Sequence, residues 1–338
     1  MILLSQRTAD PPGNASPKRY TFLDQSRGYA IFGMILVNVL GEFACMPWML
    51  KHHHAGFSYA DHIAPMFMFV VGMGFRMSFL KTMRRDGINV ARKRALKRNG
   101  ILIMLGLVYG GFHLRAGVWD ALMDIGVSGI LALPVIHASV GVRLVVAGAS
   151  LGLFQAIFSC TDYGGWLVQN SINGGPLGPL SWVFILLMGT IAIDGVFALR
   201  RKKMLLTFLA AAILLGVIGW LLRMEWGTTK AFWPFSQFAM TAPYPVFATG
   251  LCFFTISVFY LLCECAGIVF PQLTALGRNP LVLYLLQAGL VLVVRGTMQL
   301  WSGLSESVAG ALLVFLFVYG VCYMVAQNLY VKGKVIKL

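Results

Sequence analysis

The sequence has 338 residues, of which 58% are hydrophobic and only 12% are charged. A soluble domain usually has about a quarter of its residues charged, so this composition excludes a soluble enzyme, a disordered chain and a small disulfide-stapled secreted module. The net charge of +15 does not indicate nucleic-acid binding, because the basic residues lie in short runs between apolar blocks. Such runs are typical of the cytoplasmic loops of membrane proteins.

Residues 1–20 are polar and rich in proline, which predicts a flexible cytoplasmic tail. Residues 21–338 are predicted to form a single transmembrane domain. A bilayer-spanning helix uses roughly 20 mostly apolar residues, so the fold class is an all-α, polytopic integral membrane protein with about ten transmembrane helices. The ten apolar blocks cover residues 25–45, 59–80, 99–113, 121–138, 143–160, 178–199, 204–222, 243–263, 279–295 and 306–329.

The basic residues set the predicted orientation. If both termini are cytoplasmic, 22 of the 27 Lys and Arg residues lie at or near the cytoplasmic side. Only Lys51, Arg115, Arg223, Lys230 and Arg295 are left on the other side. The split agrees with the positive-inside rule and with an even number of spans. We therefore expect a multi-pass protein of the inner, cytoplasmic membrane.

The first apolar block carries an unusual polar face, made by Asp24, Arg27, Asn38 and Glu42. At 100° per residue, Arg27 and Asn38 differ by only about 20° around a helix and lie about 16 Å apart along it. Asp24 and Arg27 could simply pair at the membrane surface. Asn38 lies deeper, and polar groups at such depth usually face a bundle interior or a wet cavity. The face predicts a polar path from the inner side toward the outer end.

A histidine-rich loop follows, with His52, His53 and His54 ahead of Ser58 and Asp61. Ser-x-x-Asp before an apolar run is typical of a helix cap, which is one interpretation of Asp61. The histidines could form a solvated loop, a metal site or a catalytic base. Adjacent histidines point in different directions and the six cysteines form no CxxC pair, so we predict no metal site. A histidine beside a carboxylate suits base catalysis.

Several stretches together resemble the heparan-α-glucosaminide N-acetyltransferase-like family. The first span and the loop after it carry most of the resemblance, and three later stretches add to it. These stretches are Leu23–Asn38, Gly56–Asp61 with Pro65–Gly72, Gly175–Trp182, Trp233–Gln237 and Leu276–Tyr284. The resemblance implies a transmembrane acyltransferase that takes acetyl from cytoplasmic acetyl-CoA, its co-substrate. The acetyl group passes to an amine or hydroxyl of an amino sugar or other carbohydrate on the far side of the membrane.

The family's catalytic histidine lies in this loop and is supported by the asparagine of the first span, which here is Asn38. The family commonly places the histidine five residues before the loop glycine, and counting from Gly56 that position is Lys51. We assign His52 as the base, with His53 and His54 as alternatives. Asp61 is expected to hold the loop or the imidazole tautomer. Transfer could be direct or pass through an acetyl-histidine.

Coenzyme A carries phosphates, which need cations at the cytoplasmic face, and arginine binds phosphate through a bidentate fork. The candidates for coenzyme binding are Arg27, Asp24, Arg94, Arg98, Arg278 and Asn279. The alternative function is a transporter or permease for a small polar or anionic solute, to which intramembrane polar groups and outer histidines are also suited. No internal repeat supports it. A homodimer is left open.

Overall fold

The computed structural model describes residues 20–54, 56–109, 119–223, 233–300 and 307–336, and within them all regular secondary structure is helical. Most of the predicted tail, residues 1–19, lies outside the described part. The elements are α1 (Thr21–Leu40), η1 (Trp48–Leu50), α2 (Tyr59–Asp86), α3 (Ile88–Tyr109), α4 (Ala121–Ala132), α5 (Val140–Cys160), α6 (Tyr163–Asn170), η2 (Gly175–Leu177), α7 (Pro179–Ala198), α8 (Arg201–Leu222), α9 (Pro243–Tyr260), η3 (Leu261–Cys265), α10 (Pro271–Arg278), α11 (Pro280–Leu300) and α13 (Val308–Val331).

Every predicted apolar block falls on one of these helices where the structure describes it. Among the described residues, six helical segments are long and apolar enough to cross a membrane, and α10 with α11 gives a seventh if that bent pair is one span. The six contain α2, α5, α7, α8, α9 and α13. These helices agree with a multi-pass membrane protein. Helix α1 is not among them, because its polar face lowers its hydropathy.

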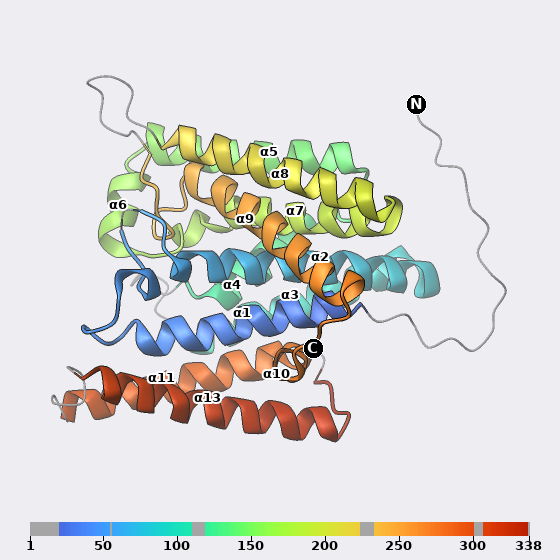
Figure 1. Ribbon diagram of the computed structural model, residues 1–338. Helices are drawn as coiled ribbons and strands as arrows, with labels where there is room; N and C mark the ends of the chain where they lie inside the picture. The colour runs from blue at the N-terminus through green and yellow to red at the C-terminus, as the bar shows by residue number, and fades with distance from the viewer. Residues whose placement is uncertain (1–19, 55, 110–118, 224–232, 301–306, 337–338) are drawn as a thin grey trace.

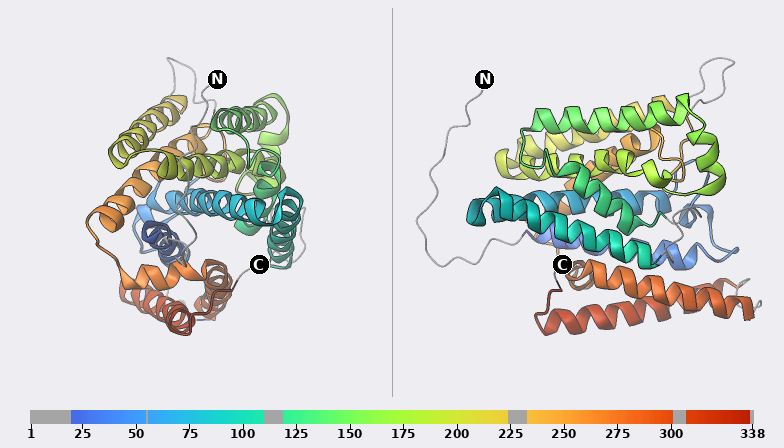
Figure 2. Two further views of the ribbon diagram at one scale, coloured as in Figure 1. Left: turned by 90° about the vertical axis from the view of Figure 1, so that its right-hand side faces the viewer. Right: turned by 180° about the vertical axis from the view of Figure 1, so that it is seen from behind.

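The long helices run side by side, and α1 and α2 occupy the middle of the bundle (Figure 1). Helix α2 packs against α1 and α7, while α10 and α13 lie on the other side of α1. Viewed end-on, α5 and α8 form one outer layer and α11 and α13 form the opposite one (Figure 2). Both outer layers expose large apolar side chains, as lipid-facing helices do.

Local sequence signals account for several helix ends. Helix α2 begins at a full capping box, in which Ser58 and Asp61 bond each other's backbone N–H groups. It ends before Gly87, whose φ of 87° lies in the left-handed region that favours glycine. Between α10 and α11 the chain bends by 91° at Asn279. Asn279 precedes Pro280, and a residue before proline is disfavoured in the helical region. At the start of α2, the capping box of Ser58 and Asp61 fixes the histidine loop against the helix.

Candidate functional site

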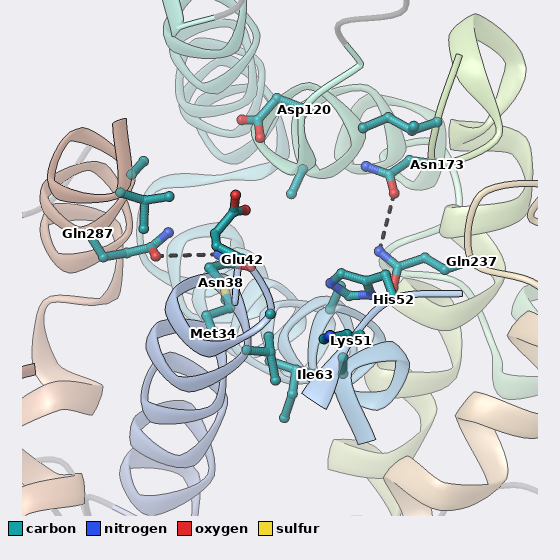
Figure 3. A pocket seen from close by; sticks show the side chains of 18 of the residues that line it. Met34, Asn38, Glu42, Lys51, His52, Ile63, Asp120, Asn173, Gln237 and Gln287 are labelled. Carbon is teal, nitrogen blue, oxygen red and sulfur yellow. Dashed lines mark hydrogen bonds between the residues drawn. The ribbon is translucent and has the colours of Figure 1, made fainter. Parts of the chain in front are cut away.

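A cavity of about 460 Å³, named the outer cavity for its place at the histidine-loop end of the bundle, lies where the ends of α1 and α11 and the starts of α2 and α4 meet that loop (Figure 3). Its wall combines apolar side chains with amides, carboxylates and cations. The lining residues that carry polar side chains are Asn38, Glu42, Lys51, His52, Asp120, Asn173, Gln237, Tyr284, Gln287 and Arg295. A concave site with a few convergent polar groups is the usual form of a small-molecule site.

His52 is the histidine of the triplet that lines this cavity, and it is held by Asp61. The Nδ1 atom of His52 lies 2.9 Å from Oδ1 of the buried Asp61 carboxylate. The other carboxylate oxygen, Oδ2, accepts hydrogen bonds from the Ser58 backbone N–H and hydroxyl at 2.9 and 3.0 Å. One carboxylate therefore caps α2 and also holds the imidazole. With Nδ1–H donating to Asp61, the lone pair of Nε2 is left for base chemistry.

His53 and His54 lie elsewhere. The ring of His53 stacks on Trp48 at 4.6 Å between centroids, and its Nε2 atom lies 2.9 Å from the Trp48 carbonyl oxygen. The ring of His54 stacks on Phe238 at 4.4 Å. Neither His53 nor His54 lines the outer cavity. The three neighbouring side chains thus leave the loop in different directions, and His52 is the one beside the cavity.

Polar residues of α11 complete the opposite wall. The Asn38 amide donates to Oε1 of Gln287 at 3.3 Å, and Tyr284, one turn earlier, donates to Asp120 at 2.5 Å. Asp120 also caps α4. Burial raises the pKa of the Asp120 carboxyl above its ordinary value, although the hydrogen bonds that it accepts oppose the rise. At the rim, Arg295 pairs with Glu42 at 2.5 Å.

A second cavity of about 390 Å³, named the inner cavity, lies toward the opposite end of α1 and α2. Arg27 and Arg98 are its two cationic lining residues, and most of the other lining side chains are apolar. A Cβ at Gly74 would lie 2.8 Å from Nη2 of Arg27, so this glycine makes room for the guanidinium. Arg98 also lies over the ring of Phe75, 5.8 Å from its centroid. The cavity suits an anionic ligand with an apolar part.

The two cavities meet at Tyr284, which lines both. A small void of about 20 Å³ lies between the two cavities and shares lining residues with each. It shares Met34, Ala64 and Ala121 with the outer cavity and Phe67 and Ile125 with the inner one. The polar face of α1 therefore runs along both spaces, with Arg27 at the inner one and Asn38 and Glu42 at the outer one.

Residues 19–186 match the model of the family described as heparan-alpha-glucosaminide N-acetyltransferase, catalytic. The matched stretch is 168 of the 338 residues, and over it the chain is similar to this family. The match confirms the resemblance and supports a transmembrane acetyltransferase in general. The matched stretch contains Arg27, Asn38, His52, Asp61 and Arg98, whereas Gln237, Tyr284 and Gln287 follow it. No curated protein is a significant match to the sequence.

The other candidate coenzyme-binding residues lie outside the inner cavity. Asp24 is buried and pairs with Arg27 at 3.3 Å. Arg94 is exposed and pairs with Asp86 at 2.6 Å, and Arg278 lies 4.2 Å from the ring centroid of Tyr330. Asn279 donates to the Lys334 carbonyl and accepts from the Ile336 N–H, and Ile336 in turn lines the cavity. Asn279 thus fixes part of the cavity wall.

Sequence reasoning assigned no role to the cavity residues Asp120, Asn173, Gln237, Tyr284 and Gln287. Gln237 and Tyr284 lie inside stretches that resemble the family, which was the signal available for them. Asn173 and Gln287 carried no signal of their own. In the described part of the chain, no group of three or more His, Cys, Asp or Glu residues could hold a metal ion.

Proposed function

We propose that the protein transfers acetyl from acetyl-CoA, bound from the cytoplasmic side, to an amino sugar or other carbohydrate acceptor on the outer side. One observation carries the proposal: a cavity with a His52–Asp61 pair and a cavity with two arginines share a wall at Tyr284. Neither cavity alone would serve both substrates. Together they give the donor and the acceptor separate entrances and a common meeting point.

The inner cavity is proposed to hold the donor. Arg27 and Arg98 are placed to bind phosphate groups of the coenzyme, because a guanidinium binds phosphate oxygens through two parallel hydrogen bonds. The apolar walls suit the uncharged pantetheine arm. The thioester would then lie near Tyr284 and Asn38, at the boundary with the outer cavity. Asn38 is proposed to orient the reacting groups or to hydrogen-bond the thioester carbonyl, where negative charge grows.

In the outer cavity, Nε2 of His52 is proposed to remove the proton of the acceptor amine or hydroxyl. The acceptor atom forms a bond to the acetyl carbonyl carbon as the carbon–sulfur bond breaks. The sulfur leaves with the bonding electron pair and takes the proton that His52 holds, which gives free coenzyme A. Asp61 stabilises the imidazolium formed between these two steps and keeps Nε2 as the free nitrogen.

The proposed membrane arrangement has ten spans, with both termini cytoplasmic and residues 21–338 as one domain in the inner membrane. It includes the helices that are too polar, short or bent to qualify by hydropathy, namely α1, α3, α4 and α11. The basic run Lys81–Arg98 lies at the other end of α2 from the histidine loop. This placement supports an inner cavity on the cytoplasmic side and a histidine outside.

Purified protein in detergent, given radiolabelled acetyl-CoA and glucosamine, tests the proposal. The wild type should form labelled N-acetylated sugar. His52→Gln should lower the rate by about 10²–10⁴-fold, the usual contribution of a general base, without changing thermal stabilisation by coenzyme A. His54→Gln is the matched control and should retain most of the rate. Loss in His54→Gln but not His52→Gln would overturn the assignment of the base.

Two results together would show that the whole proposal is wrong. If the wild type acetylates no amine or hydroxyl acceptor and coenzyme A does not raise its unfolding temperature, the proposed transfer is wrong. Uptake of a polar solute into protein-containing liposomes, without covalent change of the solute, would then favour transport.

A further inference from the structure

The segment Trp233–Met240 forms part of the outer cavity and is fixed from two sides. On one side, the Gly56 N–H donates to the Phe235 carbonyl at 2.9 Å, and His54 stacks on Phe238. On the other side, the Gly174 N–H donates to the Phe238 carbonyl at 2.9 Å. The segment thus joins the histidine loop to the turn that precedes η2 and α7, and the residue at its centre, Gln237, has little freedom to move.

The amide of Gln237 is oriented by Asn173. Asn173 adopts a left-handed backbone, φ 56°, and its carbonyl accepts from the Trp182 indole N–H at 3.1 Å. Its side-chain Nδ2 donates to the Trp119 carbonyl at 3.2 Å, which leaves Oδ1 facing Gln237. The Gln237 Nε2 atom donates to that oxygen at 3.2 Å. The chain of bonds assigns which end of each amide is nitrogen and which is oxygen.

The remaining atom, Oε1 of Gln237, is buried and accepts no hydrogen bond from any residue that the structure describes. Gln237 lines the outer cavity together with Asn173 and His52 (Figure 3). A buried amide oxygen without a donor is unfavourable, so such groups are normally paired with protein, water or ligand. An oxygen held in place beside the proposed base is suited to accept a hydrogen bond from a bound molecule.

We infer that Gln237 binds the acceptor and determines its class: Oε1 accepts a hydrogen bond from a donor group next to the reacting amine or hydroxyl. The preferred acceptors are therefore vicinal amino alcohols and vicinal diols. Asn173 acts as a positioning residue, because its side chain accepts from the Gln237 amide and fixes its orientation. The inference rests on the proposed acetyl transfer. A site built around a hydrogen bond discriminates strongly against a substrate that lacks the matching group, since its own polar atom is then left unpaired.

Two small amines that differ by one hydroxyl group test the inference. Purified wild-type protein is given acetyl-CoA with either trans-2-aminocyclohexanol or cyclohexylamine, and kcat/KM is measured for each. The wild type should prefer the amino alcohol by at least about tenfold, the effect of one good hydrogen bond. Gln237→Met keeps the length of the side chain and removes the oxygen, so the ratio should fall to about one. The same change at an exposed site of α10, Gln272→Met, is the matched control and should keep the wild-type ratio.

A second variant guards against a folding defect in Gln237→Met. Asn173→Gly keeps the left-handed backbone and removes the amide that orients Gln237, so it should also lower the ratio. Thermal stabilisation by coenzyme A shows that each variant retains a folded donor site. An unchanged ratio in both variants overturns the inference and leaves acetyl transfer standing. If the wild type transfers acetyl to none of the three acceptors, the two amines and glucosamine, then the proposed function is wrong and this inference falls with it.

Discussion

Asp61 joins two roles that the sequence presented as alternatives. Its Oδ2 atom closes the capping box of α2, and its Oδ1 atom holds Nδ1 of His52 at 2.9 Å. The side chain is fully buried, so its position is set by the helix start. The start of α2 therefore fixes the orientation of the imidazole, and helix capping and the geometry of the proposed base depend on one carboxylate.

Two substitutions separate these roles. Asp61→Asn keeps an oxygen for the cap but can present an amide N–H to Nδ1, which would leave the proton on Nε2, the wrong tautomer for a base. We expect acetyl transfer to fall about 100-fold or more, with a small change in unfolding temperature. Ser58→Ala removes the cap hydroxyl, and should cost about 1 kcal/mol of stability and only a few-fold in rate. Transfer assays and thermal unfolding check both. Equal losses of rate in the two variants would show that Asp61 acts only through the cap.

The two arginines of the inner cavity can be distinguished from the surface arginines by kinetics. Arg98→Gln should raise the KM for acetyl-CoA about tenfold and leave kcat nearly unchanged, because a phosphate contact contributes uniformly to substrate and transition state. Arg94→Gln lies on the same helix, α3, but is exposed and pairs with Asp86. Its KM should stay within about twofold of wild type, and the salt dependence of KM should weaken only in Arg98→Gln. The reverse order would place the phosphates outside the inner cavity.

At the residue level, the sequence indicated contacts between partners that are close in the chain. His52 and Asp61 are nine residues apart, and helical periodicity placed Arg27 and Asn38 on one face. The sequence put His52 first but kept His53 and His54 as alternatives, because the stacking partners of those two rings depend on the folded loop. Asn38 and Gln287 are 249 residues apart, and a single sequence carries no signal for such a contact.

At the level of helices, α2 and α7 cross with almost no space between their backbones. A Cβ placed on Gly72 would lie 2.1 Å from the Leu186 carbonyl oxygen, and one on Gly189 would lie 2.0 Å from the Phe69 carbonyl oxygen. Small residues at a crossing let membrane helices approach closely. This contact holds α2, and with it both cavities, against α7.

Adding a methyl group at this crossing should therefore be costly. Gly72→Ala forces the two backbones apart, and overpacking of this kind typically costs about 1–3 kcal/mol. We expect a lower unfolding temperature in detergent and weaker stabilisation by coenzyme A. Gly289→Ala is the control, since nothing lies within 4 Å of its added methyl group on α11. That variant should be neutral or slightly more stable, because alanine favours a helix. An equally stable Gly72→Ala would contradict the close crossing.

Hydropathy predicted where the helices lie. It did not predict which of them are long and apolar enough to count as membrane spans. Apolar blocks located the helices because a bilayer-crossing segment needs sustained apolar sequence. The polar face of α1 and the 91° bend between α10 and α11 serve the cavities and weaken the hydropathy signal. Helices α1 and α11, which carry polar cavity residues, are therefore harder to recognise as spans than α2, which lines both cavities mainly with apolar side chains.

On the scale of the whole molecule, the two cavities open toward opposite ends of α1 and α2. Helix α2 has 28 residues and is about 42 Å long at 1.5 Å per residue, longer than the bilayer core of about 30 Å. Its first residue follows the histidine loop and its last turn carries Arg84 and Arg85. A helix of this length that crosses the membrane must put these two ends on opposite sides.

Cysteine labelling in intact cells and in inverted vesicles tests this arrangement. Single cysteines are introduced into a background in which the six native ones are replaced and transfer activity is retained. Met49→Cys lies on an exposed residue beside the histidine loop, and Lys93→Cys lies on an exposed residue of α3. A membrane-impermeant maleimide should label only Met49→Cys from outside and only Lys93→Cys in inverted vesicles, while detergent should expose both. Labelling of both sites from one side would confine donor and acceptor to a single face, and the shared wall at Tyr284 would then have no role in transfer across the membrane.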